Sequence, residues 1–432
     1  MRSLHGVAAA QQRSIIVSRL GPGPPPRGRI GRWYELRHGL RPGRELSWSH
    51  TRVGPLVVAD RPPSVARRWA PHGGRALGGF FAVVAVLYVV LVPRGLPYDE
   101  PSHWADVLHV ARTWTIPRIG APDVTYEAQQ APLAYYADAL VYRAAGGGDS
   151  GFYSVRLTGL LWLALLSWLL ARAIKDAAPE LGPWAVRAGV LVAAWNPMVL
   201  ACAMSVQNDV PAVALTLAAV LAARDGVRRS AVLGGLAVLT KVSVLPAVLV
   251  VPFWIAWRRR SWRPLAHYLG VLLAVCGWWF VRNEVLYGDL TGTHAVAAAG
   301  YRFGPLPATP SLVLHLGREA VTYLWLPVEY WRNTVHAGPV AALAVAGTVA
   351  VLLGGWRTLR PMPTSAVAAV SVLAWVLTCV MLQAVAFRTA YAALAAWAIA
   401  AARTGRTAVP AAGLIGLVAV LNVWSLAAVA AR

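Results

Sequence analysis

The chain has 432 residues, of which 57% are hydrophobic and only 13% are charged, and its mean hydropathy is +0.53. Soluble domains carry about 25% charged residues, so this composition leaves too little polar surface for a soluble protein of this length. Apolar runs of roughly 17 to 25 residues, long enough to cross a bilayer, recur after Gly74. The composition therefore predicts a multi-pass membrane protein and argues against a cytosolic enzyme.

The net charge of +22 is distributed as membrane topology would place it. Residues 1–75 hold fourteen Arg against three acidic residues, a net charge of +11, which is half of the total. Much of the rest lies in short loops such as residues 258–260. Short basic loops mark the cytoplasmic side of a membrane protein. We therefore expect lipid headgroups, and no nucleic acid, as partners of these charges.

Residues 1–75 are rich in Arg, Pro and Gly and lack apolar periodicity. Such a segment buries too little apolar surface to offset chain entropy, so we expect it to be disordered and cytoplasmic. No apolar stretch precedes a small-residue cleavage site, so no signal peptide is predicted. An alternative is that translation begins downstream of this segment.

The first apolar run, about 76–92, is predicted to cross outward and to leave residues 94–130 as a large external loop with short interfacial helices. The fold class expected is an all-α transmembrane bundle of about 10–13 spans. The further apolar segments are 131–145, 152–171, 184–200, 209–223, 231–257, 266–281, 338–354, 365–386, 389–402 and 408–430. Strict alternation of these crossings puts Arg228 on the wrong side. Either 131–145 is a partial span, or a following segment is re-entrant or split.

The run 231–257 is basic at both ends and contains Lys241. A Lys inside one straight span would cost on the order of 3 kcal/mol. The run is therefore predicted to form two half-helices with Lys241 near their outer tip, and the next span then leaves residues 282–337 outside.

The most informative polar stretch follows the first span, where Asp99 and Glu100 precede Pro101. Proline suits the first turn of a helix, so we expect a helix capped by Glu100, with His103 and Asp106 on the same face as Glu100. A carboxylate held here could take a proton from an acceptor hydroxyl or amine. The alternative interpretation is a simple helix cap at the membrane interface.

Polar residues also gather where other apolar runs begin. Glu127 and Gln130 precede Pro132, a pattern that helix initiation with an aromatic belt would also explain. Asn208 and Asp209 lie at a membrane boundary, where an acid is expensive unless it is partnered. These two therefore indicate a function or a buried polar network.

Two further motifs bring cations to apolar segments. Lys241 follows Thr240 inside its apolar run and could bind a lipid phosphate, with snorkelling as the alternative. Arg282 and Asn283 follow a Trp pair, with Tyr287 shortly after, and could equally anchor the chain at the interface.

In this order, the motifs resemble those of the GT-C superfamily of membrane glycosyltransferases, closest to its protein-mannosyltransferase-like and aminoarabinose-transferase-like branch, across about residues 76–300. The resemblance implies a GT-C fold and an inverting transfer of a sugar from a polyprenyl-phosphate donor to a glycan, lipid or protein acceptor at the extracytoplasmic face of the plasma membrane. It implies Asp99 as the base, with Glu100 beside it, and Lys241 and Arg282 at the donor phosphate. The remaining candidate substrate-binding residues are His103, Glu127, Gln130, Asn208, Asp209, Asn283 and Tyr287.

The resemblance also suggests a division of the chain. Residues 1–75 would be the cytoplasmic segment, 76–300 the catalytic transmembrane module, and 301–432 an external loop followed by C-terminal spans. The sequence departs from the family pattern at Gln130 and Ala131, where relatives often have His or Pro before the Pro-Leu pair.

A different class of protein, a transporter or flippase of lipid-linked or anionic solutes, would use Asp209 and Lys241 as gating charges. It predicts a duplicated half, which the sequence does not display. No spacing of Cys, His or acidic residues requires a metal or another cofactor, although Asp99 and Glu100 could help to bind a divalent cation.

Overall fold

A computed structural model describes residues 65–97, 99–300, 325–327, 338–358 and 394–431. The chain divides into two units, Met1–Arg68 and Trp69–Arg432, and the second unit is the subject here. The expectation of disorder in residues 1–75 falls mainly outside the described residues. The expected span at 365–386, and most of the external loop expected at 282–337, lie outside them as well.

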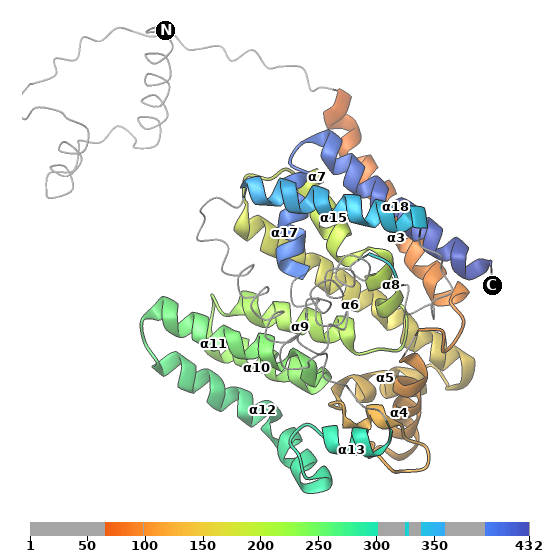
Figure 1. The fold of residues 1–432 in the computed structure, drawn as a ribbon, viewed down its shortest axis with the longest axis vertical. Coiled ribbons are helices and arrows are strands. Elements are labelled where there is room, and N and C mark those ends of the chain that lie inside the picture. The colour runs from red at the N-terminus through yellow and green to blue at the C-terminus, as the bar shows by residue number, and fades with distance from the viewer. Residues whose placement is uncertain (1–64, 98, 301–324, 328–337, 359–393, 432) are drawn as a thin grey trace, which may run out of the picture. The chain divides into compact units, whose positions relative to one another are not determined.

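Within the described residues every regular element is a helix, as the all-α prediction requires (Figure 1). The α-helices are α3 (Val65–Leu91), α4 (Glu100–Thr113), α5 (Leu133–Ala144), α6 (Gly148–Ala177), α7 (Pro183–Ala194), α8 (Pro197–Ala203), α9 (Asp209–Ala222), α10 (Val227–Thr240), α11 (Leu245–Arg259), α12 (Arg263–Tyr287), α13 (Thr293–Ala298), α15 (Gly338–Thr358), α17 (Leu394–Thr404) and α18 (Ala408–Ala430). Two 3-10 helices, η1 (Tyr126–Gln129) and η2 (Val242–Val244), lie between them.

Six helices in the described part of the chain are long and apolar enough to cross a membrane. They are α3, η2 with α11, and α6, α12, α15 and α18. The number becomes seven if α7 and α8, which meet at a bend of 63°, form one broken span. The chain is therefore a multi-pass helical membrane protein. Helices α5 and α9, with 12 and 14 residues, are shorter than the roughly 17 residues that a span needs.

The break between α7 and α8 bears on the membrane topology, because strict alternation of the crossings places Arg228 on the wrong side. The side chain of Asn196 accepts a hydrogen bond from the Val199 backbone N–H at 3.0 Å, and Pro197 occupies the first turn of α8. Asn196 thus caps a new helix inside the apolar segment 184–200, so this segment is broken, as one of the two alternatives requires, while the 12-residue α5 also fits the other alternative, a partial span at 131–145. The predicted break at Lys241 is also confirmed, because α10 ends at Thr240 and α11 begins at Leu245.

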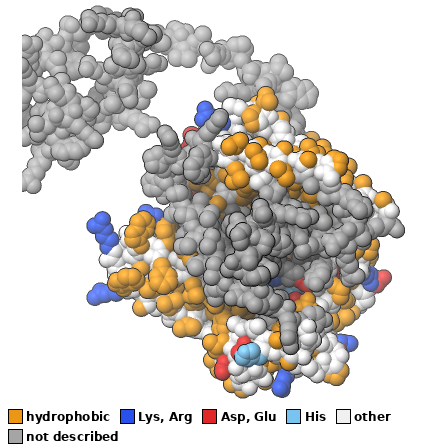
Figure 2. Space-filling model, in the orientation of Figure 1, with side chains coloured by type: hydrophobic (Ala, Val, Ile, Leu, Met, Phe, Trp, Pro, Cys, Tyr) orange, Lys and Arg blue, Asp and Glu red, His pale blue; other side chains and the backbone are white. Residues whose placement is uncertain are grey.

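The helices bury one face against each other and leave another face apolar and exposed. Leu163 and Leu166 on α6 are completely buried, whereas Leu161 on the same helix is 73% exposed. Trp257 and Val285 are exposed to a similar degree. Hydrophobic side chains accordingly cover much of the visible described surface (Figure 2). Such a surface is suited to lipid, the solvent that the composition predicts.

Close packing of α6 against α8 depends on a glycine. Gly159 on α6 lies so near α8 that a Cβ atom at this position would collide with the carbonyl oxygen of Ala203. Small residues allow this kind of close helix contact in membrane proteins. The contact holds the segment that leads from α8 into α9, on which Asn208 and Asp209 lie.

We expect Gly159→Ala to lower the free energy of unfolding by about 1–3 kcal/mol, the usual cost of overpacking. Thermal unfolding of the purified protein in detergent would measure the change. Gly270→Ala on α12 is the matched control, because its Cβ would meet no atom within 4 Å. That variant should be neutral or stabilised, since Ala favours a helix by about 1 kcal/mol over Gly. Equal melting of the two variants would contradict the prediction.

Candidate functional site

The acidic stretch after the first span forms the start of α4. Asp99 is the N-cap residue and Glu100 is the first helical residue, so the helix begins one residue earlier than expected. Pro101 lies in the first turn, as its fixed φ angle favours. The His103 backbone N–H donates to the Asp99 carbonyl oxygen at 3.0 Å. Asp99 and His103 therefore lie one helical turn apart on one face of α4.

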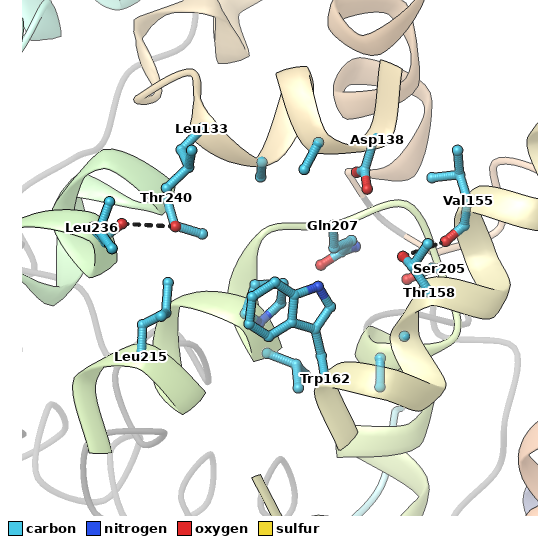
Figure 3. A pocket seen from close by; sticks show the side chains of 16 residues that line it. Leu133, Asp138, Val155, Thr158, Trp162, Ser205, Gln207, Leu215, Leu236 and Thr240 are labelled. Atoms are coloured by element: carbon cyan, nitrogen blue, oxygen red, sulfur yellow. Dashed lines mark hydrogen bonds between the residues drawn. The ribbon is translucent and has the colours of Figure 1, made fainter. Parts of the chain in front are cut away.

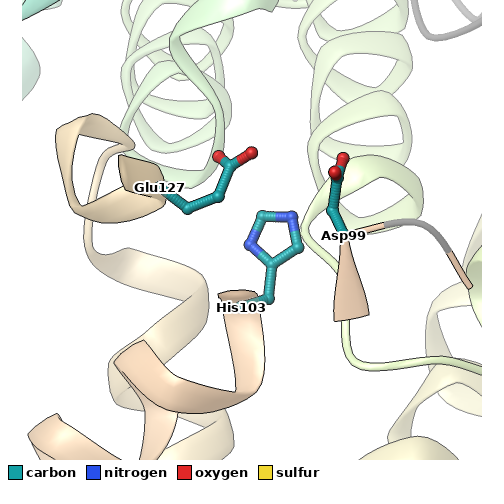
Figure 4. A group of neighbouring side chains, drawn as sticks. All are labelled: Asp99, His103 and Glu127. Carbon is teal, nitrogen blue, oxygen red and sulfur yellow. The ribbon is translucent and has the colours of Figure 1, made fainter. Parts of the chain in front are cut away.

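Asp99 and His103 meet Glu127, which η1 brings from the other side of the loop (Figure 4). One ligand atom from each of these three residues lies within 4.8 Å of the others. All three side chains are buried, with exposures of 2%, 0% and 4%. The imidazole of His103 lies between the two carboxylates. The sequence predicted each residue singly, and the fold assembles them into one cluster.

Neighbouring hydroxyl groups fix the orientation of this cluster. The Nδ1 atom of His103 lies 2.8 Å from the Tyr135 hydroxyl oxygen, and the Tyr135 hydroxyl donates to the Glu127 carbonyl oxygen at 3.5 Å. The Tyr126 hydroxyl donates to Oδ1 of Asp99 at 3.1 Å. The Oγ1 atom of Thr125 caps η1 by accepting from the Glu127 backbone N–H at 3.3 Å.

Burial sets the protonation of this region. It lowers the pKa of His103 well below its usual value, with the Lys241 charge as a second cause, so the imidazole is neutral. Burial also raises the pKa of Glu127, an effect that Lys241 and the nearby Gln130 side chain oppose. Burial likewise raises the pKa of Asp106 to about 8. A carboxyl group with a pKa of about 8, such as that of Asp106, can exchange protons near physiological pH.

Lys241 lies at the break between α10 and η2, where it is the C-cap residue of α10. Its Nζ atom lies 2.8 Å from Oδ1 of Asp209 and donates to Oδ1 of Asn208 at 2.9 Å. Lys241 and Asp209 are 4% and 1% exposed. Asp209 therefore has a partner in a buried polar network, as the sequence analysis predicted. The Lys241 charge also acts on His103 and Glu127, so the two groups belong to one electrostatic region.

Glu100 faces away from the cluster, into a buried ion pair with Arg156 on α6. The Nε and Nη2 atoms of Arg156 donate to the two carboxylate oxygens of Glu100 at 2.7 and 2.5 Å. The backbone N–H groups of Gly95 and Val206 donate to the same carboxylate at 2.9 and 3.0 Å. The remaining Arg156 donors reach carbonyl oxygens of Val89, Val92 and Pro93.

Glu100, His103 and Asp106 were expected to act from one face of α4, but in the structure Glu100 and His103 have partners on different helices. Glu100 contacts Arg156 on α6, whereas His103 contacts Tyr135 on α5. Residues three apart on a helix are rotated by about 60° from alignment, so Glu100 and His103 reach partners on different helices. His103 pairs with Asp99, its neighbour at the fourth position.

We expect Arg156→Met to lower the free energy of unfolding by about 3–5 kcal/mol, because it leaves the Glu100 carboxylate buried and unpaired. Thermal unfolding and size-exclusion profiles in detergent would measure the loss. Arg94→Met is the matched control, since the ion pair of Arg94 with Asp149 is exposed and such pairs contribute little. A loss of stability as small as that of the control would contradict the structural role of the buried pair.

Arg282, Asn283 and Tyr287 lie at the end of α12 and fasten it to the loop between α4 and η1. Arg282 donates to the Pro117 carbonyl oxygen at 2.7 Å and stacks 4.6 Å from the ring centroid of Trp279. The Tyr287 hydroxyl accepts from the Ile119 backbone N–H at 3.1 Å, and Asn283 is buried. The contacts described for these residues lie within this loop and helix end, apart from the Asp99 cluster.

Three residues of the site were not among the sequence candidates. Arg156 carried a signal, a charge inside the apolar run 152–171, which is costly unless paired. Tyr126 and Tyr135 lay within the motif around Glu127, where an aromatic belt explained them equally well. Their contacts with Asp99 and His103 join residues 27 and 32 positions apart, a pairing that no local pattern specifies.

A cavity of about 280 Å³ adjoins this region, between α5, α6, α9 and α10 (Figure 3). Its wall is mostly apolar, with Leu133, Trp162 and Leu215 among the lining residues. Gln207 and Thr240 also line it, and they directly precede Asn208 and Lys241 in the chain. The cavity thus places apolar space beside the ends of α9 and α10 that carry the Lys241 group.

The sequence matches no family model. No curated protein matches it either. Among solved structures, the chain is similar to apo ArnT from Cupriavidus metallidurans, with 16% identity, a TM-score of 0.36, and coverage of 82% of this chain and 78% of that chain. It is also similar to the same protein bound to undecaprenyl phosphate, with 17% identity, a TM-score of 0.33, and coverage of 80% and 77%.

Proposed function

We propose that this chain is an integral membrane glycosyltransferase that moves a sugar from a polyprenyl-phosphate donor to an acceptor at the extracytoplasmic face. The observation that carries the proposal is the pairing of a buried carboxylate cluster with a buried ammonium group in one electrostatic region. Transfer from a lipid phosphate needs both groups, a base for the acceptor and a cation for the departing phosphate. A second substrate of the same enzyme would be the glycan, lipid or protein that receives the sugar.

Asp99 is the base of the proposed reaction. It sits at the N-terminus of α4, beside the Glu127 carboxylate and the neutral His103 imidazole. A single displacement at the anomeric carbon needs one base on the acceptor side and no second nucleophilic carboxylate, so the proposed transfer inverts the sugar. Glu100 takes a positioning role, because its carboxylate already accepts from Arg156 and from two backbone N–H groups.

Lys241 is the cation proposed to stabilise the departing phosphate. An ammonium group has three N–H donors, and two partners, Asn208 and Asp209, lie within hydrogen-bonding distance of its Nζ atom. The third donor can serve a phosphate oxygen. The neighbouring apolar cavity suits the first isoprene units of a lipid tail. Arg282, near the C-terminal end of α12, is the second candidate contact for the phosphate.

The first test measures sugar transfer from a panel of radiolabelled polyprenyl-phosphate sugars in membranes that contain the full-length protein. We expect one donor to be consumed, and we expect Asp99→Asn to slow that reaction by about 10²–10⁴-fold, the usual contribution of a general base. Asp123→Asn is the matched control, because Asp123 lies in the same loop but pairs with His109 and Arg112 at the surface. Its rate should stay near that of the wild type.

Full activity of a folded Asp99→Asn protein would overturn the assignment of the base. Movement of labelled lipid between leaflets without any transfer of sugar would instead favour a flippase, which would use Asp209 and Lys241 as gating charges.

The second test separates the role of Lys241 in transfer from its role in folding. Lys241→Met leaves Asp209 buried and unpaired, so we expect a loss of about 3–5 kcal/mol in stability together with loss of transfer. The double variant Lys241→Met with Asp209→Asn removes both charges and should recover much of the stability. Its transfer rate should remain reduced by about 10²–10³-fold, as for other groups that stabilise developing negative charge. Wild-type transfer by the double variant would exclude Lys241 as the phosphate-binding cation.

A further inference from the structure

Asn422 is a polar residue inside the most apolar span of the described part of the chain. Helix α18, which carries it, has a mean hydropathy of 2.1, the highest among the six candidate spans there. The Asn422 side chain is completely buried. Polar side chains inside a membrane segment are costly unless they have partners, and they often mark functional positions. Asn422 belongs neither to the acidic cluster nor to the Lys241 group, so its presence calls for another explanation.

The amide of Asn422 links α18 to the bend between α7 and α8. Its nitrogen donates to the Trp195 carbonyl oxygen at 2.8 Å and to the Val418 carbonyl oxygen at 2.9 Å. The Val418 contact lies within α18, whereas Trp195 lies 227 positions away, at the C-cap of α7. Both acceptors are carbonyl oxygens, so only the nitrogen of the amide can face them. The C-terminal span therefore contacts the backbone of the bend directly.

The bend is the reason why the Trp195 carbonyl needs this donor. In an unbroken helix it would accept from the Val199 backbone N–H, four residues further on. Here the Val199 N–H donates to the Asn196 side chain at 3.0 Å, because α8 starts anew at a bend of 63°. Backbone polar groups in a span need protein partners, since lipid offers none. Asn422 thus supplies the donor that the bend takes away.

The segment that follows α8 contacts both halves of the proposed site. Helix α8 has only seven residues, and all of them are buried. Beyond it, the Val206 backbone N–H donates at 3.0 Å to Glu100, the residue that follows Asp99. The Asn208 side chain accepts from Nζ of Lys241 at 2.9 Å. A shift of α8 at the bend would therefore change the distance between the Asp99 carboxylate and the Lys241 ammonium group.

We propose that Asn422 is a positioning residue of the transferase. By holding the Trp195 carbonyl at the bend, it sets the distance between the base and the cation at the departing phosphate. This role in transfer rests on the proposed function, whereas the contact with the bend does not. A single displacement needs the base and the cation on opposite sides of one anomeric carbon, so both groups must keep their places at the same time.

Two variants remove the contact with Trp195 in different ways. Asn422→Ala removes the whole amide and favours a helix. Asn422→Thr keeps a hydroxyl group, which can donate to the carbonyl oxygen four residues earlier in its own helix but not also to Trp195. The second variant therefore keeps the polar contact within α18 if the first one fails to fold. Ser425→Ala is the matched control, because Ser425 is buried on the same helix and interacts with Tyr88 on α3.

Hydrogen–deuterium exchange of the purified full-length protein in lipid nanodiscs measures the bend without any substrate. Ala203, Ser205 and Gln207 line the cavity of Figure 3, so water can reach the end of α8. We expect the backbone amides of residues 197–208 to exchange about fivefold faster or more in both Asn422 variants. Exchange in α12 should stay unchanged, and Ser425→Ala should match the wild type in both segments.

Transfer of labelled sugar measures the positioning role. We expect kcat to fall about 10–100-fold in the Asn422 variants, as misplacement of reacting groups does, and to stay near the wild-type value in Ser425→Ala. A double-mutant cycle separates positioning from general damage. In the Lys241→Met, Asp209→Asn background, Asn422→Ala should slow transfer less than about twofold, because the cation whose distance it sets is gone.

Unchanged exchange of residues 197–208 in folded Asn422 variants would overturn the contact at the bend. Faster exchange with a wild-type kcat, or an equal fall of kcat in the background that lacks the cation, would overturn the positioning role and leave the proposed function standing. If the wild type consumes no donor, the proposed function fails and the role in transfer fails with it, while the exchange measurement still decides the contact at the bend.

Discussion

The buried ion pair of Glu100 and Arg156 is the contact on which the arrangement of the site depends. Removing two charges from water costs several kcal/mol per ion, and only good geometry with full hydrogen bonding offsets that cost. Here the donors of Arg156 also reach carbonyl oxygens at the end of α3, and the Glu100 carboxylate also accepts from the loop between α8 and α9. One pair thus joins α3, α4, α6 and that loop, and it fixes Asp99, the residue before Glu100.

Most of the bundle could be predicted from the sequence because each helix that crosses a bilayer needs its own run of roughly 17 to 25 apolar residues. The apolar runs predicted α15 and α18 within about four residues, and they predicted the apolar parts of α3, α6 and α12, which extend up to 11 residues beyond those runs. The doubly basic run around Lys241 predicted the break between α10 and α11. The position of the bend between α7 and α8 was less evident. Asn196 and Pro197 signalled a helix start, but inside an apolar segment this signal competes with hydropathy.

The site was predictable as a set of residues, and its pairings were not. Asp99, His103, Glu127 and Lys241 stood out because charged or titratable groups near apolar runs are costly without a purpose. Hydropathy and helical periodicity describe one segment at a time, so they could not reveal that Arg156 turns Glu100 away from the cluster. That pairing joins residues 56 positions apart and depends on where the fold places the start of α4 relative to Arg156 on α6.

Three charged residues of the site lie at the ends of helices, where a bundle of apolar helices can accommodate polar groups. Asp99 caps the start of α4, Asp209 lies in the first turn of α9, and Lys241 caps the end of α10. Each charge has the sign that the helix dipole favours at that end. Helix ends also expose backbone groups that need polar partners. The short lengths of α9 and α10 therefore bring helix ends, and the charges that they stabilise, into the interior of the bundle.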